Sequence, residues 1–282
     1  MSKIAIVTDS TSDLPEELLK KYDISVTPLT VHFGHKEFVD DGKDLTLEDF
    51  YIRLKESDVF PTTSQPSPGD FIELYKNLLK THNSIISIHI SNKLSATMGS
   101  ALLSKKDFPG KDITIIDTLA AHAPLGLIVL KAAQMNSEDI SKDEIVTKVN
   151  QMINKVKAFI LPKTLENLKR GGRIGKARGL LASLLDVKPI LTLTPDGHIG
   201  IFKTTRRWSK AKRIAVESIG DFITGNKDLI VSLSDANATA DVEEVGAEIR
   251  ALYNPKEIMK VKIGIVVGTH VGTGIGITFY EE

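Results

Sequence analysis

Short apolar runs rich in β-branched residues alternate with helix-like segments along the first half of this chain, and this alternation constrains its fold most strongly. Continuous apolar runs bounded by turn residues are typical of strands that are buried on both faces. Strands that alternate with helices predict a mainly parallel sheet flanked by helices. The predicted strands are 4–7, 24–29, 84–90 and 113–116, and the predicted helices begin near Pro15 and cover 47–55, 68–80 and 141–156.

The pattern changes after the amphipathic segment 141–156. Pro195-Asp196-Gly197 is a typical hairpin turn. We therefore expect two α/β domains, residues 1–157 and 158–282, with a partly antiparallel sheet in the second. The strands predicted for the second domain are 189–193, 198–203, 229–233 and 262–267.

Charge and cysteine content exclude several classes of function. Lys and Arg number 36, as do Asp and Glu, so the net charge is zero and no global field attracts nucleic acid. The absence of cysteine excludes thiolate nucleophiles and thiolate metal sites, and it fits a cytoplasmic location. The longest uncharged stretches, such as 118–130, are too short to span a bilayer, so no stable membrane insertion is expected.

Motifs of self-contained catalysts are also missing. The sequence has no Walker A, H-E-x-x-H or G-x-S-x-G motif, and its seven histidines are not spaced as metal ligands. We therefore predict no catalytic residue, no metal ligand and no cofactor.

Five polar loops remain as candidates for a site, because ligands of open α/β sheets bind beyond the carboxyl ends of the strands. Each loop also has a purely structural interpretation. A helix could be capped by Ser12, Asp13 or Ser67, or by a residue of the 91–97 loop. The 168–175 loop could be a basic surface turn, and the single histidine of the last loop, His270, could have a structural role. The loops are 8–13, 61–69, 91–97, 168–175 and 268–276.

Six segments, taken in order, resemble the DegV family of bacterial fatty-acid-binding proteins. Each segment is weak alone, but together they extend over nearly the whole chain. They are T-D-S-T-S-D-L-P (8–15), T-S-Q-P-S-P (63–68), L-S-A-T (94–97), L-K-R-G-G-R-I (168–174), L-L-D-V-K-P-I-L (184–191) and G-T-H-V-G-T-G-I-G (268–276).

The resemblance implies a carrier that holds a long-chain fatty acid between two α/β domains. Such a carrier is not an enzyme. It presents the carboxylate to a separate, dihydroxyacetone-kinase-like fatty acid kinase, and the acyl phosphate product enters phospholipid synthesis. The residues implied are Thr63, Ser95, His270 and Arg173 for the carboxylate, Ser64, Ala96, Thr97 and Gly272 for the pocket lining, and Lys203 and Arg206 for the kinase.

Three departures from the family pattern predict a change in the preferred acyl chain. Ala96 replaces a glycine, Thr273 replaces a proline, and the loop after Asp117 contains Pro124 in place of serine and glycine residues. Two other functions stay open. The chain could be a small-molecule phosphotransferase or hydrolase that uses His270 with Asp9, or a purely regulatory lipid-binding protein.

Overall fold

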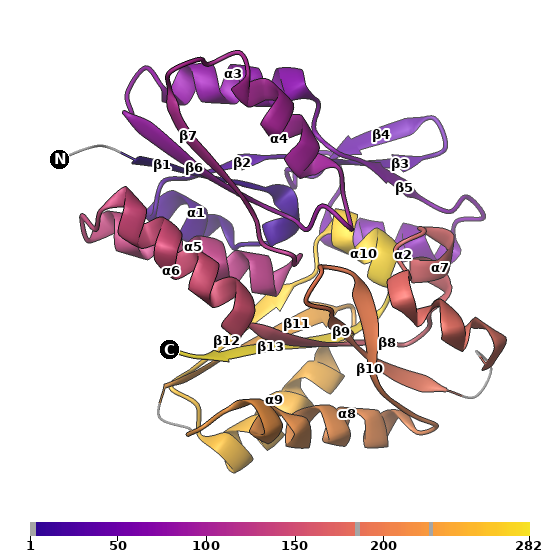
Figure 1. Ribbon diagram of the computed structural model, residues 1–282. Coiled ribbons are helices and arrows are strands. Elements are labelled where there is room, and N and C mark those ends of the chain that lie inside the picture. Colours follow the sequence, from indigo (N-terminus) through magenta and orange to yellow (C-terminus); the bar gives the residue numbers. More distant parts are fainter. Residues whose placement is uncertain (1–3, 184–186, 226–227) are drawn as a thin grey trace. The chain divides into compact units, whose positions relative to one another are not determined.

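The computed structural model describes residues 4–183, 187–225 and 228–282 (Figure 1). The chain divides into two compact units, Met1–Asn154 and Lys155–Glu282. The first unit contains a parallel sheet and the second a mixed sheet. This arrangement confirms the predicted α/β class.

A four-stranded parallel sheet with strand order β2-β1-β6-β7 forms the centre of the first unit. Every residue of β1 and β6 is buried, which explains their largely apolar sequences. Helices α3 and α4 lie on one face of the sheet, and α1, α5 and α6 lie on the other (Figure 1). The strands are β1 (Ile4–Asp9), β2 (Ile24–Thr27), β6 (Ser84–His89) and β7 (Asp112–Asp117), and the helices are α1 (Glu16–Lys21), α3 (Pro68–Leu78), α4 (Thr97–Lys105), α5 (Ala123–Ser137) and α6 (Lys142–Lys155).

The core beneath α3 and α4 joins these helices to the sheet. Phe71 and Tyr75 of α3 pack with Val7 of β1, Ile85 of β6 and Ala101 of α4. Burying a side chain of this size contributes about 1.5–3 kcal/mol, so a few such contacts fix α3 and α4 on the sheet. Ser67 begins α3 with a capping box, which confirms its predicted capping role.

A small antiparallel sheet of order β4-β3-β5 completes the first unit together with α2 (Leu47–Glu56). Its strands are β3 (Thr30–Phe33), β4 (Lys36–Val39) and β5 (Thr62–Ser64). The sequence predicts a loop around Thr63, whereas the structure pairs Thr63 with Val31 of β3. Three polar residues carry no strand signal of their own, and only the pairing with β3 makes them a strand.

The second unit is built on a six-stranded sheet of order β10-β9-β8-β13-β11-β12, in which only β11 and β12 pair in parallel. Helices α8 and α9 pack on this sheet through a core that includes Ala215, Val245, Phe159 and Phe279. The strands are β8 (Lys157–Pro162), β9 (Lys188–Leu193), β10 (Ile199–Thr205), β11 (Leu229–Ala236), β12 (Glu257–Lys262) and β13 (Gly274–Glu281), and the helices are α7 (Glu166–Arg170), α8 (Trp208–Glu217), α9 (Thr239–Tyr253) and α10 (Ile265–Val271).

The predicted hairpin turn is confirmed between β9 and β10. Gly197 has a φ of 83°, which favours glycine, and its N–H donates to the Thr194 carbonyl at 2.8 Å. Residues 184–186 of the L-L-D-V-K-P-I-L segment lie outside the described residues, while Lys188 begins β9.

Two further local predictions were wrong. The strand predicted at 262–267 ends at Lys262, and Ile265–Val271 forms helix α10. A short β-branched run does not distinguish a strand from a buried helix, and here the tertiary contacts favour the helix. Neither Ser12 nor Asp13 caps α1, whose N-cap is Pro15. Asp9 instead caps the 3-10 helix Ser10–Ser12 by accepting from the Thr11 N–H.

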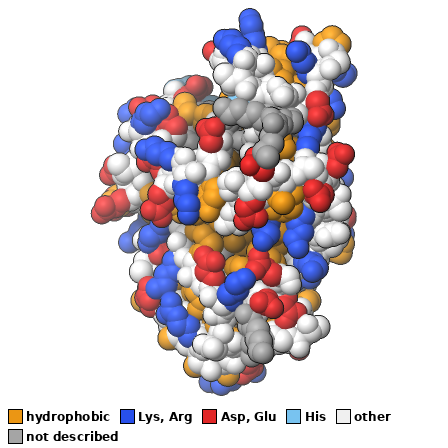
Figure 2. Space-filling model, turned by 90° about the vertical axis from the view of Figure 1, so that its left-hand side faces the viewer, with side chains coloured by type: hydrophobic (Ala, Val, Ile, Leu, Met, Phe, Trp, Pro, Cys, Tyr) orange, Lys and Arg blue, Asp and Glu red, His pale blue; other side chains and the backbone are white. Residues whose placement is uncertain are grey.

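Charged side chains of both signs are interspersed over the face that Figure 2 shows, as the balanced composition predicts. Within residues 4–183, 187–225 and 228–282, no helix combines the length and apolar character needed to cross a bilayer.

Asp241 of α9 is the centre of a polar cluster that joins α8 and α9 to the end of β8. Its carboxylate accepts from Lys163 Nζ at 2.5 Å, from Lys212 Nζ at 2.8 Å and from Trp208 Nε1 at 2.9 Å. Burial alone would raise the pKa of Asp241, but these hydrogen bonds outweigh it and lower that pKa to about 2. The cluster therefore stabilises the second unit when Asp241 is ionised.

We expect Asp241→Asn to destabilise the protein at pH 7 by about 1–3 kcal/mol, because Lys163 loses its carboxylate partner and Lys212 retains Glu244 but loses Asp241. The lowered pKa means that this contribution is complete above about pH 4 and disappears as the pH falls towards 2. Urea unfolding of wild type and variant between pH 7 and pH 3 measures it. Glu243→Gln breaks the exposed pair with Lys260 and should cost less than about 1 kcal/mol. Equal losses for both variants would contradict this account.

Candidate functional site

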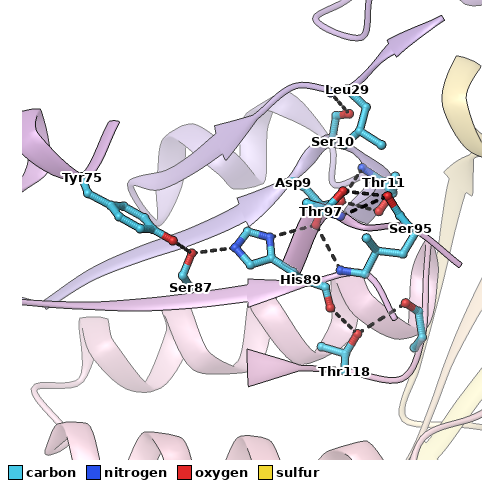
Figure 3. A network of polar contacts seen from close by, with 12 residues as sticks. Asp9, Ser10, Thr11, Leu29, Tyr75, Ser87, His89, Ser95, Thr97 and Thr118 are labelled. Carbon is cyan, nitrogen blue, oxygen red and sulfur yellow. Dashed lines mark hydrogen bonds and ion pairs between the residues drawn. The ribbon is translucent and has the colours of Figure 1, made fainter. Parts of the chain in front are cut away.

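The loops after β1, β6 and β7 meet around the buried carboxylate of Asp9 (Figure 3). Oδ1 accepts from the Thr11 N–H at 3.1 Å and from the Thr11 hydroxyl. Oδ2 accepts from the Ile90 N–H at 3.0 Å and contacts His89 Nδ1 at 2.9 Å. The side chain of Asp9 is 0% exposed, so these donors replace water around the negative charge.

A hydrogen-bond chain continues from Asp9 into the core of the first unit. His89 Nε2 lies 2.6 Å from Ser87 Oγ, and the Tyr75 hydroxyl donates to Ser87 Oγ at 2.8 Å (Figure 3). His89 is the imidazole that contacts Asp9, and His270, which the hydrolase alternative pairs with Asp9, belongs to the other unit. These hydrogen bonds could not be predicted from the sequence, because nothing in the spacing of Asp9 and His89 indicates that β1 and β6 are neighbours.

Ser95 lies in the loop between β6 and α4. Its Oγ is 2.8 Å from Thr97 Oγ1 and accepts from the Thr97 N–H at 3.3 Å. Ser95 is half-buried, Thr97 is fully buried and Ala96 is exposed. The structure thus brings together two of the predicted residues, and Ser95 is the more accessible of the two hydroxyls.

Thr63 and Ser64 lie on β5 of the small sheet. Thr63 is half-buried, whereas Ser64 is exposed and its Oγ lies 2.9 Å from His32 Nε2. Because neighbouring strand residues point to opposite faces, Thr63 and Ser64 present their hydroxyls to different sides of β5.

In the second unit, the predicted His270 and the Arg-Gly-Gly-Arg segment lie together. A Cβ atom at Gly171 would come within 2.3 Å of His270 Nδ1, so only glycine allows the turn after α7 to approach the imidazole. Arg173 Nη1 donates to the Gly171 carbonyl at 2.8 Å. Gly171 therefore serves the close approach of backbone to side chain that the sequence suggests, whereas Gly172 is favoured by its φ of 72°.

Asn167 of α7 fixes the end of α10, a role that no sequence pattern indicated. Its Nδ2 donates to the Thr269 carbonyl at 3.2 Å, one residue before His270. Gly272 has a φ of 68°, and a Cβ atom there would come within 2.8 Å of Asn167 Oδ1. Gly272 is therefore required by the packing of α10 against α7.

Burial lowers the pKa of His270 to about 4, and the charge of Arg173 adds to this effect. The imidazole is therefore neutral at pH 7, with one nitrogen able to donate and the other able to accept. Beside the permanently charged Arg173, the second unit offers one cationic and one neutral donor for an anion.

The two residues predicted to contact a kinase differ in their surroundings. Lys203 and Arg206 are both exposed, at the end of the edge strand β10 and just beyond it. Lys203 Nζ donates to Ser218 Oγ at 2.9 Å and lies 3.9 Å from Asp221. No acidic side chain within 4.0 Å of Arg206 is recorded in the part of the chain that the structure describes, so Arg206 is the better placed to meet a partner.

Asp40, which follows β4, was missed at the sequence level. Burial raises its pKa to about 7, with a further contribution from the charge of Asp13, while the Ser10 hydroxyl acts in the opposite direction. The carboxyl group therefore titrates near neutral pH. No group of three or more His, Cys, Asp or Glu side chains among the described residues is arranged to hold a metal ion.

We expect Asp40→Asn to change how stability depends on pH. Because the folded pKa of Asp40 lies above its unfolded value, its favourable contribution is complete below about pH 4 and is lost as the pH rises through 7. The variant should therefore gain stability relative to wild type between pH 5 and pH 8, on the order of 3 kcal/mol. Urea unfolding at both pH values measures this, with the exposed Asp44→Asn as control. Parallel pH profiles of Asp40→Asn and wild type would refute the assignment.

Comparison with known proteins places the whole chain in one family. A family model described as "Uncharacterised protein, DegV family" matches residues 3–282. A DegV domain-containing protein of Caldanaerobacter subterraneus subsp. tengcongensis is 35% identical over 282 residues, which cover 100% of both chains.

Two solved structures are similar over nearly their full length. A DegV family protein of Thermus thermophilus, described by its fatty acid binding, is 32% identical with a TM-score of 0.91, and the match covers 99% of this chain and 100% of that one. A stearic acid-binding protein of Eubacterium ventriosum is 28% identical with a TM-score of 0.88, and the match covers 100% and 98%. Because the family model and the relatives extend over the whole chain, this protein belongs to the DegV family.

Proposed function

We propose that this protein binds a long-chain fatty acid and presents its carboxyl group to a separate fatty acid kinase, which forms the acyl phosphate. The observation that carries the proposal is the fatty acid binding stated for two structures that match over the full length at 28–32% identity. The protein acts as a cytoplasmic carrier rather than as an enzyme, and the kinase supplies the nucleotide.

The carboxylate accepts hydrogen bonds from Thr63 and Ser95 of the first unit, and His270 and Arg173 of the second unit support it. The half-buried hydroxyl of Ser95 and the neutral imidazole of His270 are the kinds of donor that hold a carboxylate without adding a second charge. Arg173 supplies the one permanent positive charge, which suits the doubly charged acyl phosphate. Ser64, Ala96, Thr97 and Gly272 line the pocket or support it.

Tail and head group have different energetic roles. Each buried methylene contributes about 0.8 kcal/mol, so a sixteen-carbon tail contributes on the order of 10 kcal/mol before the cost of ordering the ligand. A buried carboxylate without donors would be very costly, and each donor to it contributes about 1.5–3 kcal/mol. The tail therefore dominates affinity, while the donors fix the head group where the kinase can reach it.

The kinase meets the exposed end of β10. Arg206 is exposed, and a charge in that position increases the rate of association and selects the partner. Lys203 contributes less, because its ammonium group is already bound to Ser218.

We expect the double variant Thr63→Ala/Ser95→Ala to abolish kinase-dependent formation of acyl phosphate, at least about a hundredfold loss, because the carboxylate loses two hydroxyl donors. Trapping the acyl phosphate with hydroxylamine measures turnover, and native mass spectrometry of the purified proteins reports which acyl chain they carry. Thr62→Ala, a change at an exposed residue of the same strand, should leave turnover within about twofold of wild type. Undiminished turnover in the double variant would reject the head-group assignment.

Omitting the kinase separates the carrier from the enzyme alternative. Wild-type protein with ATP and fatty acid alone should form no acyl phosphate, whereas turnover would favour the phosphotransferase interpretation. Fatty acid bound without any kinase-dependent turnover would favour a purely regulatory protein.

We expect Arg206→Ala to weaken the affinity for the kinase at least about tenfold at low ionic strength, because the steering charge is lost. The affinity for fatty acid should not change. Surface plasmon resonance with the kinase at two salt concentrations measures the first, and displacement of a fluorescent fatty acid measures the second. Lys210→Ala, a charge change on the exposed side of α8, is the control. Equal kinase affinity of Arg206→Ala and wild type would remove Arg206 from the docking surface.

A further inference from the structure

We propose that His89 is a positioning residue of the head-group site. Through its hydrogen bond to the Asp9 carboxylate it fixes the loop that carries Ser95, and so it sets how strongly the site prefers a carboxylate to an uncharged head group. The inference rests on the proposed function, in which Ser95 donates to the fatty acid.

The Asp9–His89 pair holds three loops at one edge of the sheet (Figure 3). Asp9 binds the backbone N–H of Ile90, the residue just before the Ser95 loop, and both donors of Thr11 in the loop after β1. The carbonyl of His89 accepts from the Thr118 N–H at 3.1 Å and from its hydroxyl at 2.8 Å, which fixes the loop after β7. A change at this pair therefore affects the loops after β1, β6 and β7.

Each ring nitrogen of His89 has a partner in this series of hydrogen bonds. A carboxylate only accepts, so His89 Nδ1 donates to Asp9, and Nε2 lies 2.6 Å from Ser87 Oγ. Ser87 Oγ in turn accepts from the Tyr75 hydroxyl. The imidazole is therefore held at both nitrogens, and it packs edge-to-face against Phe71 with ring centroids 5.2 Å apart.

Ser87, His89 and Asp9 are the residue types of a catalytic triad, but burial excludes that role here. All three side chains are 0% exposed, and the Ser87 hydroxyl is enclosed between His89 and Tyr75. No substrate carbonyl can reach such a hydroxyl. A network that is saturated with hydrogen bonds and closed to solvent instead holds its neighbours in one geometry.

The backbone passes this geometry on to Ser95. Ser91 follows Ile90, and its carbonyl accepts from the N–H groups of Leu94 at 2.9 Å and Ser95 at 3.0 Å. The Ser91 N–H donates to the Ala120 carbonyl at 2.7 Å. A displaced Ile90 would therefore move the Ser95 hydroxyl, and hydrogen bonds weaken steeply when distance and angle change. Contacts with an apolar tail are non-directional and should tolerate the same shift.

The test compares two ligands that differ only in the head group, tetradecanoate and tetradecan-1-ol, by displacement of a fluorescent fatty acid. The carboxylate preference is the dissociation constant of tetradecan-1-ol divided by that of tetradecanoate. In His89→Leu this ratio should fall at least about tenfold, while the dissociation constant of the alcohol stays within about threefold of its wild-type value. His89→Asn keeps a donor towards Asp9 and should restore part of the carboxylate preference. If the role of His89 were purely structural, His89→Leu would weaken the binding of both ligands to the same degree.

Further variants keep the proposal testable if His89→Leu does not fold. Thr11→Val removes the hydroxyl donor to Asp9 but leaves the Thr11 N–H in place, and it should lower the same ratio to a smaller degree. Ser104→Ala removes another buried hydrogen bond of the first unit, to the Ala101 carbonyl, and should leave the ratio unchanged.

An unchanged ratio in His89→Leu, or in Thr11→Val where His89→Leu does not fold, would overturn the positioning role while the proposed function stands. Failure of wild-type protein to bind tetradecanoate would overturn both.

Discussion

The buried carboxylate of Asp9 is the interaction on which the candidate site of the first unit depends. It is held by donors from Thr11, His89 and the backbone N–H of Ile90. A buried charge without partners would be very costly, so these donors must stay in place for the unit to fold. The same requirement aligns the loops after β1 and β6. The same hydrogen bonds therefore stabilise this edge of the sheet and fix the geometry of the Ser95 loop.

In the second unit, close packing of the backbone fixes the position of the predicted site residues. Gly171 lets the turn after α7 approach the His270 imidazole, and Gly272 lets α10 end against Asn167. Burial lowers the pKa of His270 and keeps the imidazole neutral next to the charge of Arg173. An anion bound there would meet a single full positive charge. His270 and Arg173 can thus both donate to a carboxylate, and they repel each other little because only Arg173 is charged.

Sequence patterns predicted the α/β class and most strands, because β1 and β6 are buried on both faces and read as apolar runs. The same patterns failed where tertiary contacts decide. The β-branched run before Gly268 became helix α10, and the polar residues around Thr63 became strand β5 through pairing with β3. The motifs located the loops but not their partners: Asp9–His89 and Asn167–Thr269 join residues 80 and 102 positions apart, and no local spacing reveals such pairs.

The loop after β7, where the sequence predicts a departure from the family pattern, has an unusual backbone conformation. Leu119 and His122 have φ values of 55° and 59°, and sparsely populated backbone conformations of this kind cost a non-glycine residue about 1–3 kcal/mol. Tertiary contacts offset this strain. His122 Nδ1 lies 2.6 Å from Asp13 Oδ2, and the His122 N–H donates to the Thr11 carbonyl at 2.7 Å. These contacts fix the loop after β7 to the segment that Asp9 caps, so the strain is offset within the first unit.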